Sequence, residues 1–117
     1  MSKRDESLYL EDILDSAVAI KKFVIGMDFK EFCNDRKTYS ATIREYIVIG
    51  EAVSHVINFL EEKIPSYPWR MVKDFRNMIV HEYFGVNEKI VWDLTVSELD
   101  ELISSIKNLK AQSNICS

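Results

Sequence analysis

The chain has 117 residues, and its composition, with 47% hydrophobic and 29% charged residues, is ordinary for one globular domain. Its formal net charge of −4 argues against a surface that is basic all over, although a local basic patch is compatible with it. Only three glycines and two prolines are present, which favours long helices over a β structure with many turns.

The first predicted element is a helix whose apolar stripe starts at Leu10. Its apolar residues alternate at steps of three and four, which draws one helical stripe: Leu10, Ile13, Ala17, Ile20, Val24 and Met27. Gly26 and Asp28 are expected to end this helix. The spacing from Asp28 to Glu31 is that of a capping box, so a short second helix is predicted to begin there.

A long helix is predicted over about 37–62, with two apolar stripes. One contains Ile43, Tyr46, Gly50, Val53, Ile57 and Leu60, and the other contains Tyr39, Ile49, Ala52, Val56 and Phe59. The second stripe has two explanations. Either the stripe forms a self-complementary dimer interface, or the helix is central and is covered on both sides within one chain. Gly50 costs about 1 kcal/mol relative to alanine in a helix interior, which a close backbone crossing would explain.

Pro65 and Pro68 separate this helix from the next one. The next helix is expected to pack through a core face: Met71, Val72, Phe75, Met78 and Ile79. Gly85 is expected to end it, because glycine tolerates a left-handed backbone. Asn87 can then cap a turn that contains residues 90–92.

A last helix is predicted after Thr95 and Glu98, which have the spacing of a second capping box. Its stripe contains Leu99, Leu102, Ile103, Ile106 and Leu109. No segment alternates as a strand would, so the chain is predicted to be an all-α bundle of four main helices plus short helices. One domain is expected over 1–112, with a disordered tail over 113–117.

The compartment is predicted from the cysteines and from the absence of targeting segments. Cys33 and Cys116 are far apart, which is typical of two unpaired thiols in a reducing cytosol. Neither CxxC nor HxxxH spacing occurs, so no metal site and no cofactor are predicted. The first residues lack an apolar signal region, and no apolar run is long enough to span a membrane. We therefore expect a cytoplasmic protein.

The candidate functional residues lie in the segment from Arg76 to Phe84. Arginine can hold a phosphate with a fork of donors, and histidine can exchange protons near neutral pH. Arg76 and His81 are five positions apart, so on an ideal helix they point about 140° apart. They could meet one phosphate only if the helix unwinds near His81 or if a second subunit supplies its own copy. The spacing therefore favours a dimeric site.

These residues suggest a way to cleave RNA. His81 would move a proton as a ribose 2′-hydroxyl attacks the adjacent phosphate, and Arg76 would stabilise the charge that develops on the phosphoryl oxygens. Asn77 could orient the imidazole or the phosphate. Tyr83 could bind a phosphate oxygen or stack on a base. Arg70 and Lys73, with Lys63 and Lys89, could form a basic rim.

The same residues also have structural explanations, and spacing alone leaves both open. Arg76 could pair with Asp74 or Glu82, and His81 could cap the C-terminus of its helix. The basic rim could consist of ordinary solvated charges. Glu51 is either a solvated or interface carboxylate, or part of the cleft. The two tryptophans, Trp69 and Trp92, are expected to anchor the core or an interface rather than a ligand.

Several motifs resemble one known family. Arg76 to Tyr83 matches the RX4HXY form of the HEPN motif, and Ile49-Gly50-Glu51-Ala52 resembles the "GEA" element of the central helix. The segment 65–70 resembles a "P-x-x-P-W" loop, and 81–84 with 91–92 resembles an "HDYF … VW" stretch in which Glu82 replaces the commoner aspartate. From about Leu8 to Leu109, the chain is similar to HepT-like toxins.

The resemblance implies an all-α HEPN fold, a homodimer, and a metal-independent ribonuclease with a composite site at the dimer cleft. It implies that Arg76 and His81 are catalytic and that Asn77 supports them. It also implies that an MntA-like nucleotidyltransferase antitoxin attaches AMP to Tyr83, where the added negative charge would repel RNA. The alternative is a non-catalytic HEPN subunit that partners a nucleotidyltransferase, with Arg76 holding a nucleotide phosphate.

Overall fold

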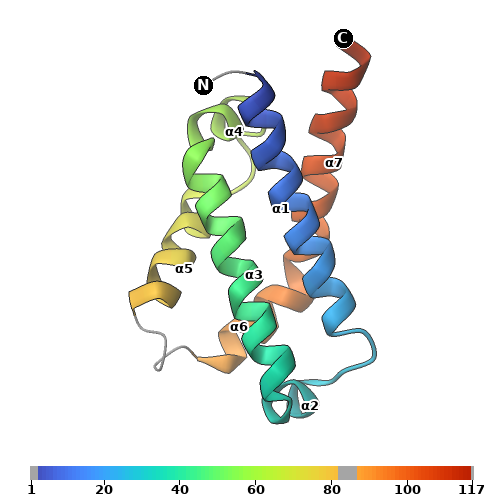
Figure 1. Cartoon of the computed structure of the whole chain (residues 1–117), viewed down its shortest axis with the longest axis vertical. Coiled ribbons are helices and arrows are strands. Elements are labelled where there is room, and N and C mark those ends of the chain that lie inside the picture. The colour runs from blue at the N-terminus through green and yellow to red at the C-terminus, as the bar shows by residue number, and fades with distance from the viewer. Residues whose placement is uncertain (1–2, 82–86, 117) are drawn as a thin grey trace.

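The computed structural model describes the backbone of residues 3–81 and 87–116 and the side chains of 5–81 and 87–112. All regular elements in these residues are helices (Figure 1): α1 (Lys3–Phe23), α2 (Phe29–Asn34), α3 (Arg36–His55), α4 (Ile57–Lys63), α5 (Trp69–His81), α6 (Glu88–Ser97) and α7 (Leu99–Cys116). The prediction of four main helices plus short ones is confirmed, since α1, α3, α5 and α7 are the long elements. No described helix is long and apolar enough to cross a membrane.

Helix α3 lies at the centre of the fold. It packs against α1 on one side and α5 on the other, and α7 packs against α1 (Figure 1). The core includes Ile13 and Ile20 of α1, Val53 of α3, Ile79 of α5 and Ile106 of α7, all of which are fully buried. Burying a side chain of this size stabilises the fold by about 1.5–3 kcal/mol. The α3–α5 pair is therefore held in place by the same core as the rest of the bundle.

The second apolar stripe of the central helix is covered within the chain. Ile49, Ala52 and Val56 are at most 3% exposed, and Tyr39 and Phe59 pack against the same core. Of the two explanations for this stripe, the structure supports the central helix covered on both sides. The stripe therefore supplies no separate surface for a dimer.

The predicted long helix is interrupted at Val56, between α3 and α4. The backbone there leaves the helical region (φ −125°, ψ 24°), and the Val56 amide bonds to the Val53 carbonyl at 3.1 Å. Val56 and Leu60 are both buried on the two sides of this break. Neither glycine nor proline marks the position, so the break follows from tertiary packing rather than from a local signal.

The first predicted capping box is confirmed. The Glu31 amide donates to Asp28 Oδ1 at 2.8 Å, and the Asp28 amide donates to Glu31 Oε1 at 3.0 Å. Gly26 adopts a positive φ of 75° just after α1, a conformation that glycine reaches at low cost. The turn between α1 and α2 therefore follows from local sequence alone.

The second predicted capping box is wrong, because Thr95 lies inside α6. Its hydroxyl donates a hydrogen bond to the Val91 carbonyl at 2.8 Å and accepts one from the Tyr46 hydroxyl at 2.7 Å. Burial raises the pKa of Tyr46 above its usual value, so the hydroxyl stays protonated and can donate. Helix α7 begins at Leu99 and continues to Cys116. The Asn87 cap is confirmed by a 2.8 Å bond from the Lys89 amide.

Replacing Asp35 with alanine is expected to destabilise the protein in a pH-dependent way. Asp35 caps α3 by accepting the Thr38 amide at 3.0 Å, and this bond lowers the pKa of its carboxyl. Because the folded pKa is the lower one, the stability it contributes is present above the unfolded value of about 3.9 and is lost as the pH falls below it. Urea unfolding at pH 7 and pH 2.5 should therefore show a deficit that shrinks in acid. Asp12→Ala, on the exposed side of α1, is the control, and a deficit that is equal at both pH values would contradict this role.

Candidate active site

Helix α5 lies very close to α3 where Arg76 crosses Gly50. A Cβ at position 50 would lie 2.1 Å from Arg76 Cβ and 2.4 Å from its Cγ, so the two helices reach this spacing only without a side chain there. The N-terminal end of α5 is fixed by Trp69, which is 1% exposed and donates its indole N–H to the Ile64 carbonyl at 2.9 Å. The predicted core role of Trp69 is confirmed, as is the close crossing at Gly50.

The guanidinium of Arg76 is held at both terminal nitrogens. Nη1 donates to Asn77 Oδ1 at 2.7 Å, and Nη2 forms an ion pair with Glu51 Oε1 on α3. Its Nε is buried and has no hydrogen-bond partner among the described residues. The expected partner Asp74 is replaced by Glu51, and Glu82 lies outside the described residues. The Asn77 side chain thus accepts from the guanidinium of Arg76.

His81 is the last residue of α5 and is exposed. The helix continues through it, so the unwinding that would let it turn toward Arg76 does not occur before this residue. On a regular helix the two side chains of one chain point about 140° apart. Arg76 contacts Gly50, Glu51 and Asn77. Among the described residues, His81 is not one of its hydrogen-bond partners. Tyr83, the predicted modification site, lies outside the described residues, as does Gly85.

Of the four residues of the predicted basic rim, Arg70 and Lys73 lie on the α5 surface between Arg76 and His81, whereas Lys63 belongs to α4 and Lys89 to α6. Counting from Arg76 at 100° per residue, Lys73 lies at about 60°, Asn77 at about 100°, Arg70 at about 120° and His81 at about 140°. We call this surface the basic sector of α5. Its members come from a single helix, so their arrangement does not depend on loops.

The cations of this sector differ in their partners. Arg70 pairs with Glu61 of α4, with Nε and Oε2 3.2 Å apart and the arginine side chain 68% exposed. Such an exposed pair contributes only about 0–1 kcal/mol, so a phosphate could replace the carboxylate. Lys73 is half-buried, and no ion pair holds it within the described residues. Both cations are therefore available to an anionic ligand.

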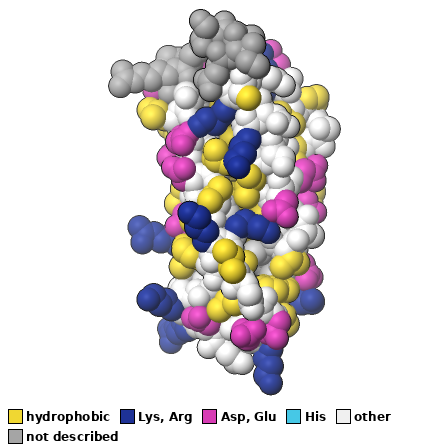
Figure 2. All heavy atoms as spheres, turned by 90° about the vertical axis from the view of Figure 1, so that its right-hand side faces the viewer, with side chains coloured by type: hydrophobic (Ala, Val, Ile, Leu, Met, Phe, Trp, Pro, Cys, Tyr) yellow, Lys and Arg dark blue, Asp and Glu magenta, His cyan; other side chains and the backbone are white. Residues whose placement is uncertain are grey.

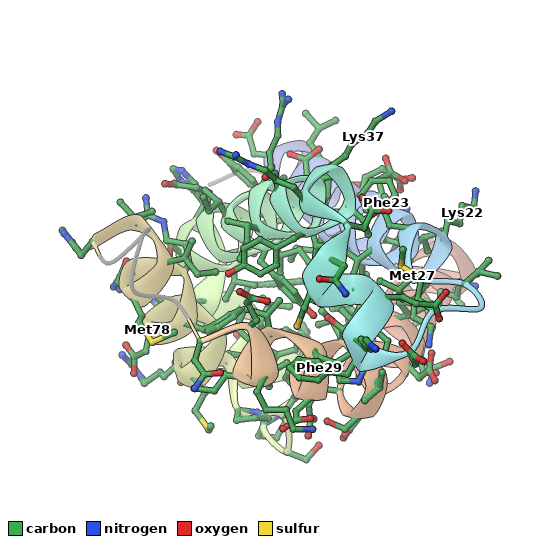
Figure 3. The ribbon with its side chains drawn as sticks, turned by 90° about the horizontal axis from the view of Figure 1, so that it is seen from below. Lys22, Phe23, Met27, Phe29, Lys37 and Met78 are labelled. Carbon is green, nitrogen blue, oxygen red and sulfur yellow. The ribbon has the colours of Figure 1, made fainter. Side chains whose placement is uncertain are left out.

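The opposite side of α5 faces an apolar depression of about 500 Å³. Met71, Phe75 and Met78 of α5 line it together with Ile90 and Leu94 of α6 and Leu99 and Leu102 of α7. Met78 lies at the edge of the molecule, on α5 (Figure 3). Met71 is 68% exposed at this depression, so its predicted place in the core is wrong. The reason is that α5 packs chiefly on α3 and α4.

A face away from α5 shows a different charge pattern. On the α7 side, lysine and arginine side chains are interspersed with aspartate, glutamate and apolar groups (Figure 2). Charges of both signs that alternate over a surface give no continuous attraction for a polyanion. The basic sector of α5 is therefore a better candidate than this face for binding phosphates.

Comparison with known proteins identifies relatives over most of the chain. The profile of one protein family, described as ribonuclease HepT-like, matches residues 13–109. A Methanocaldococcus jannaschii protein named "Putative RNase" is 37% identical over 109 residues, which cover 93% of this chain and 90% of that protein. The "Probable ribonuclease HepT" of Thermococcus cleftensis is 32% identical over 108 residues, covering 92% and 98%. No solved structure matches the chain significantly.

Proposed function

This chain belongs to the HepT-like ribonuclease family, and on that premise we propose that it is a ribonuclease with Arg76 and His81 as its catalytic residues. The observation that carries the proposal is the fixed guanidinium of Arg76, which is held by Asn77 of α5 and Glu51 of α3. Two further cations, Arg70 and Lys73, lie on the same helix as Arg76. An arginine fixed in this way can bind a phosphodiester with its remaining donors. His81, exposed at the end of the same helix, supplies the proton chemistry.

The proposed reaction is cleavage by the neighbouring ribose. His81 takes the proton of the 2′-hydroxyl, the 2′-oxygen attacks the adjacent phosphorus, and the bond to the 5′-oxygen of the next nucleotide breaks. The leaving 5′-oxygen takes a proton from water, the proton held by His81 passes to solvent, and a 2′,3′-cyclic phosphate remains. Arg76 stabilises the negative charge that grows on the non-bridging oxygens, a contribution of about 10²–10³ in rate. No step calls for a metal ion, so we propose a metal-independent enzyme.

We further propose a homodimer in which each site combines Arg76 of one chain with His81 of the other. The divergence of the two side chains on α5 supports this arrangement, because one straight helix cannot present both to one phosphate. A twofold axis beside the basic sector would bring two copies of this sector into one cleft. The exposed apolar Val80 lies in the same sector and is 45% exposed, which suits a surface that a second chain partly covers.

The proposal is tested by incubating RNA with the purified wild-type chain and with His81→Ala. We expect wild type to cleave RNA in the presence of a chelator and to leave the all-deoxy version of the same sequence intact, because the reaction needs a 2′-hydroxyl. His81→Ala should cleave neither. The control is His55→Ala, since His55 lies at the end of α3 with its ring 4.6 Å from that of Tyr9. It should behave as wild type.

The opposite results would point elsewhere. Cleavage by His81→Ala at the wild-type rate would show that His81 moves no essential proton. Cleavage by neither protein, together with tight nucleotide binding that depends on Arg76, would favour the non-catalytic subunit of a nucleotidyltransferase. The two candidate functions therefore make different predictions for the same purified proteins.

We also propose that the protein is the toxin of a toxin–antitoxin pair and that an MntA-like nucleotidyltransferase silences it by attaching AMP to Tyr83. The position of this tyrosine supports the proposal, since it follows His81 by two residues. A phosphate-linked nucleotide there would repel and obstruct RNA.

Intact-mass measurement after incubation with an MntA-like nucleotidyltransferase and ATP should show one or more AMP units on wild type and none on Tyr83→Phe. The modified protein should lose RNA cleavage. An unmodified wild-type mass would remove the AMP proposal and leave the nuclease proposal standing. Equal modification of Tyr83→Phe would place the AMP on another residue.

A further inference from the structure

Glu51 lies beside the close crossing of α3 and α5. It follows Gly50, whose missing side chain lets Arg76 Cβ and Cγ rest on the α3 backbone. One position further along α3, the Glu51 carboxylate reaches Arg76 Nη2. Helix α3 therefore supplies both the surface on which the arginine lies and the carboxylate that holds its end.

The two terminal nitrogens of Arg76 are held by different helices. Asn77 on α5 accepts from Nη1 at 2.7 Å, and Glu51 on α3 accepts from Nη2. A guanidinium carries two N–H groups on each terminal nitrogen, so each of them keeps a donor beyond the one already used. The side chain is 26% exposed, which leaves this end within reach of a ligand. Its orientation is therefore set before any phosphate arrives.

The charge of Glu51 opposes its positional effect. A carboxylate beside the guanidinium weakens the attraction for an anionic RNA. That repulsion is screened, because the Glu51 side chain is 47% exposed to solvent. The orientation of the guanidinium, in contrast, acts directly on the reacting phosphate, and small errors of placement cost large factors in rate. We expect the loss of orientation to outweigh the gain in attraction when Glu51 is removed.

We propose that Glu51 is a positioning residue that orients the Arg76 guanidinium toward the scissile phosphate. This inference rests on the proposed ribonuclease function and adds a residue to it. Glu51 touches neither the reacting atoms nor the substrate, and it acts through Arg76 alone. Its effect should therefore appear mainly in kcat, while KM stays the same or falls because an anion has been removed.

The test measures kcat and KM for RNA cleavage by wild type, Glu51→Ala and Glu51→Gln. Glu51→Ala should lower kcat about ten-fold without raising KM. Glu51→Gln keeps an oxygen that accepts from Nη2, so it should recover most of kcat. The matched control is Glu11→Ala. Glu11 pairs with Lys110 between α1 and α7 and has the same 47% exposure, but it lies outside the basic sector. Its kcat should equal that of wild type.

Two further measurements separate this role from a general effect on folding. The Glu51→Ala/Arg76→Ala double variant should be no slower than Arg76→Ala, because Glu51 has no other route to the reaction. NMR signals of the Arg76 guanidinium should be restrained in wild type and Glu51→Gln and motionally averaged in Glu51→Ala. An unchanged kcat in Glu51→Ala beside an active wild type, or additive losses in the double variant, would overturn the role of Glu51 alone. An inactive wild type would instead overturn the ribonuclease proposal, and the catalytic consequence of Glu51 with it.

Discussion

Mixing Arg76→Ala chains with His81→Ala chains is expected to raise RNA cleavage far above that of either variant alone. The reason lies in the geometry of α5, which remains helical from Trp69 through His81. On such a helix Arg76 and His81 point about 140° apart, so one chain does not bring both to the same phosphate. In the proposed homodimer the wild-type Arg76 of one variant meets the wild-type His81 of the other.

The size of the recovery follows from counting chains. Random pairing makes about half of the dimers mixed, and each mixed dimer has one complete site of two, so about a quarter of wild-type activity should return. Chains should be exchanged by co-expression with two tags, and each variant mixed with Arg76→Ala/His81→Ala should show no gain in cleavage. If no activity returned although mixed dimers were isolated, the composite site would be wrong. Both residues would then have to act within one chain.

Gly50→Ala is expected to destabilise the protein and to reduce RNA cleavage strongly. The new Cβ would lie 2.1 Å from Arg76 Cβ, and neither atom is the far end of a flexible side chain, so α3 and α5 must separate. Overpacking of this kind costs about 1–3 kcal/mol. Alanine recovers at most about 1 kcal/mol in helix propensity relative to glycine. Separation also moves Arg76 away from Glu51, so activity should fall by more than stability alone would require.

A double-mutant cycle identifies the clash as the cause. Arg76→Ala keeps the Cβ that the methyl group introduced by Gly50→Ala would meet, so it should not relieve the destabilisation. Arg76→Gly removes that atom and should relieve most of it. Urea unfolding of the single and double variants supplies the free energies. If Gly50→Ala were as stable as wild type with Arg76 in place, the close crossing would not set the spacing of these helices.

Much of the helical architecture could be predicted from local patterns. The stripe from Leu10 to Ile20 is buried as its period requires, and the box from Asp28 to Glu31 begins α2. Such features depend on residues within one or two turns of each other, so neighbouring positions carry all the information. The same is true of the basic sector of α5, because one regular helix places Arg70, Lys73 and Asn77 between Arg76 and His81.

The errors share a different physical origin. Thr95 has the spacing of a cap, but its hydroxyl is used inside α6 by Tyr46, which lies 49 positions earlier in the chain. Val56 interrupts a helix without any local breaker, and Met71 lies exposed although it belongs to an apolar face. In each case a contact between distant segments, or the lack of one, outweighs a local preference of about 1 kcal/mol or less.

In the candidate site, too, some features follow from the local sequence and others depend on tertiary packing. The identities of Arg76, Asn77 and His81, their shared helix and the divergence of the proposed catalytic pair all follow from the order of residues, because helix geometry converts spacing into direction. The carboxylate that holds Arg76 does not follow from order, since Glu51 is 25 positions away on α3. Only the packing of α5 on α3 brings it there, and that packing depends on a glycine whose missing side chain allows two helix backbones to approach.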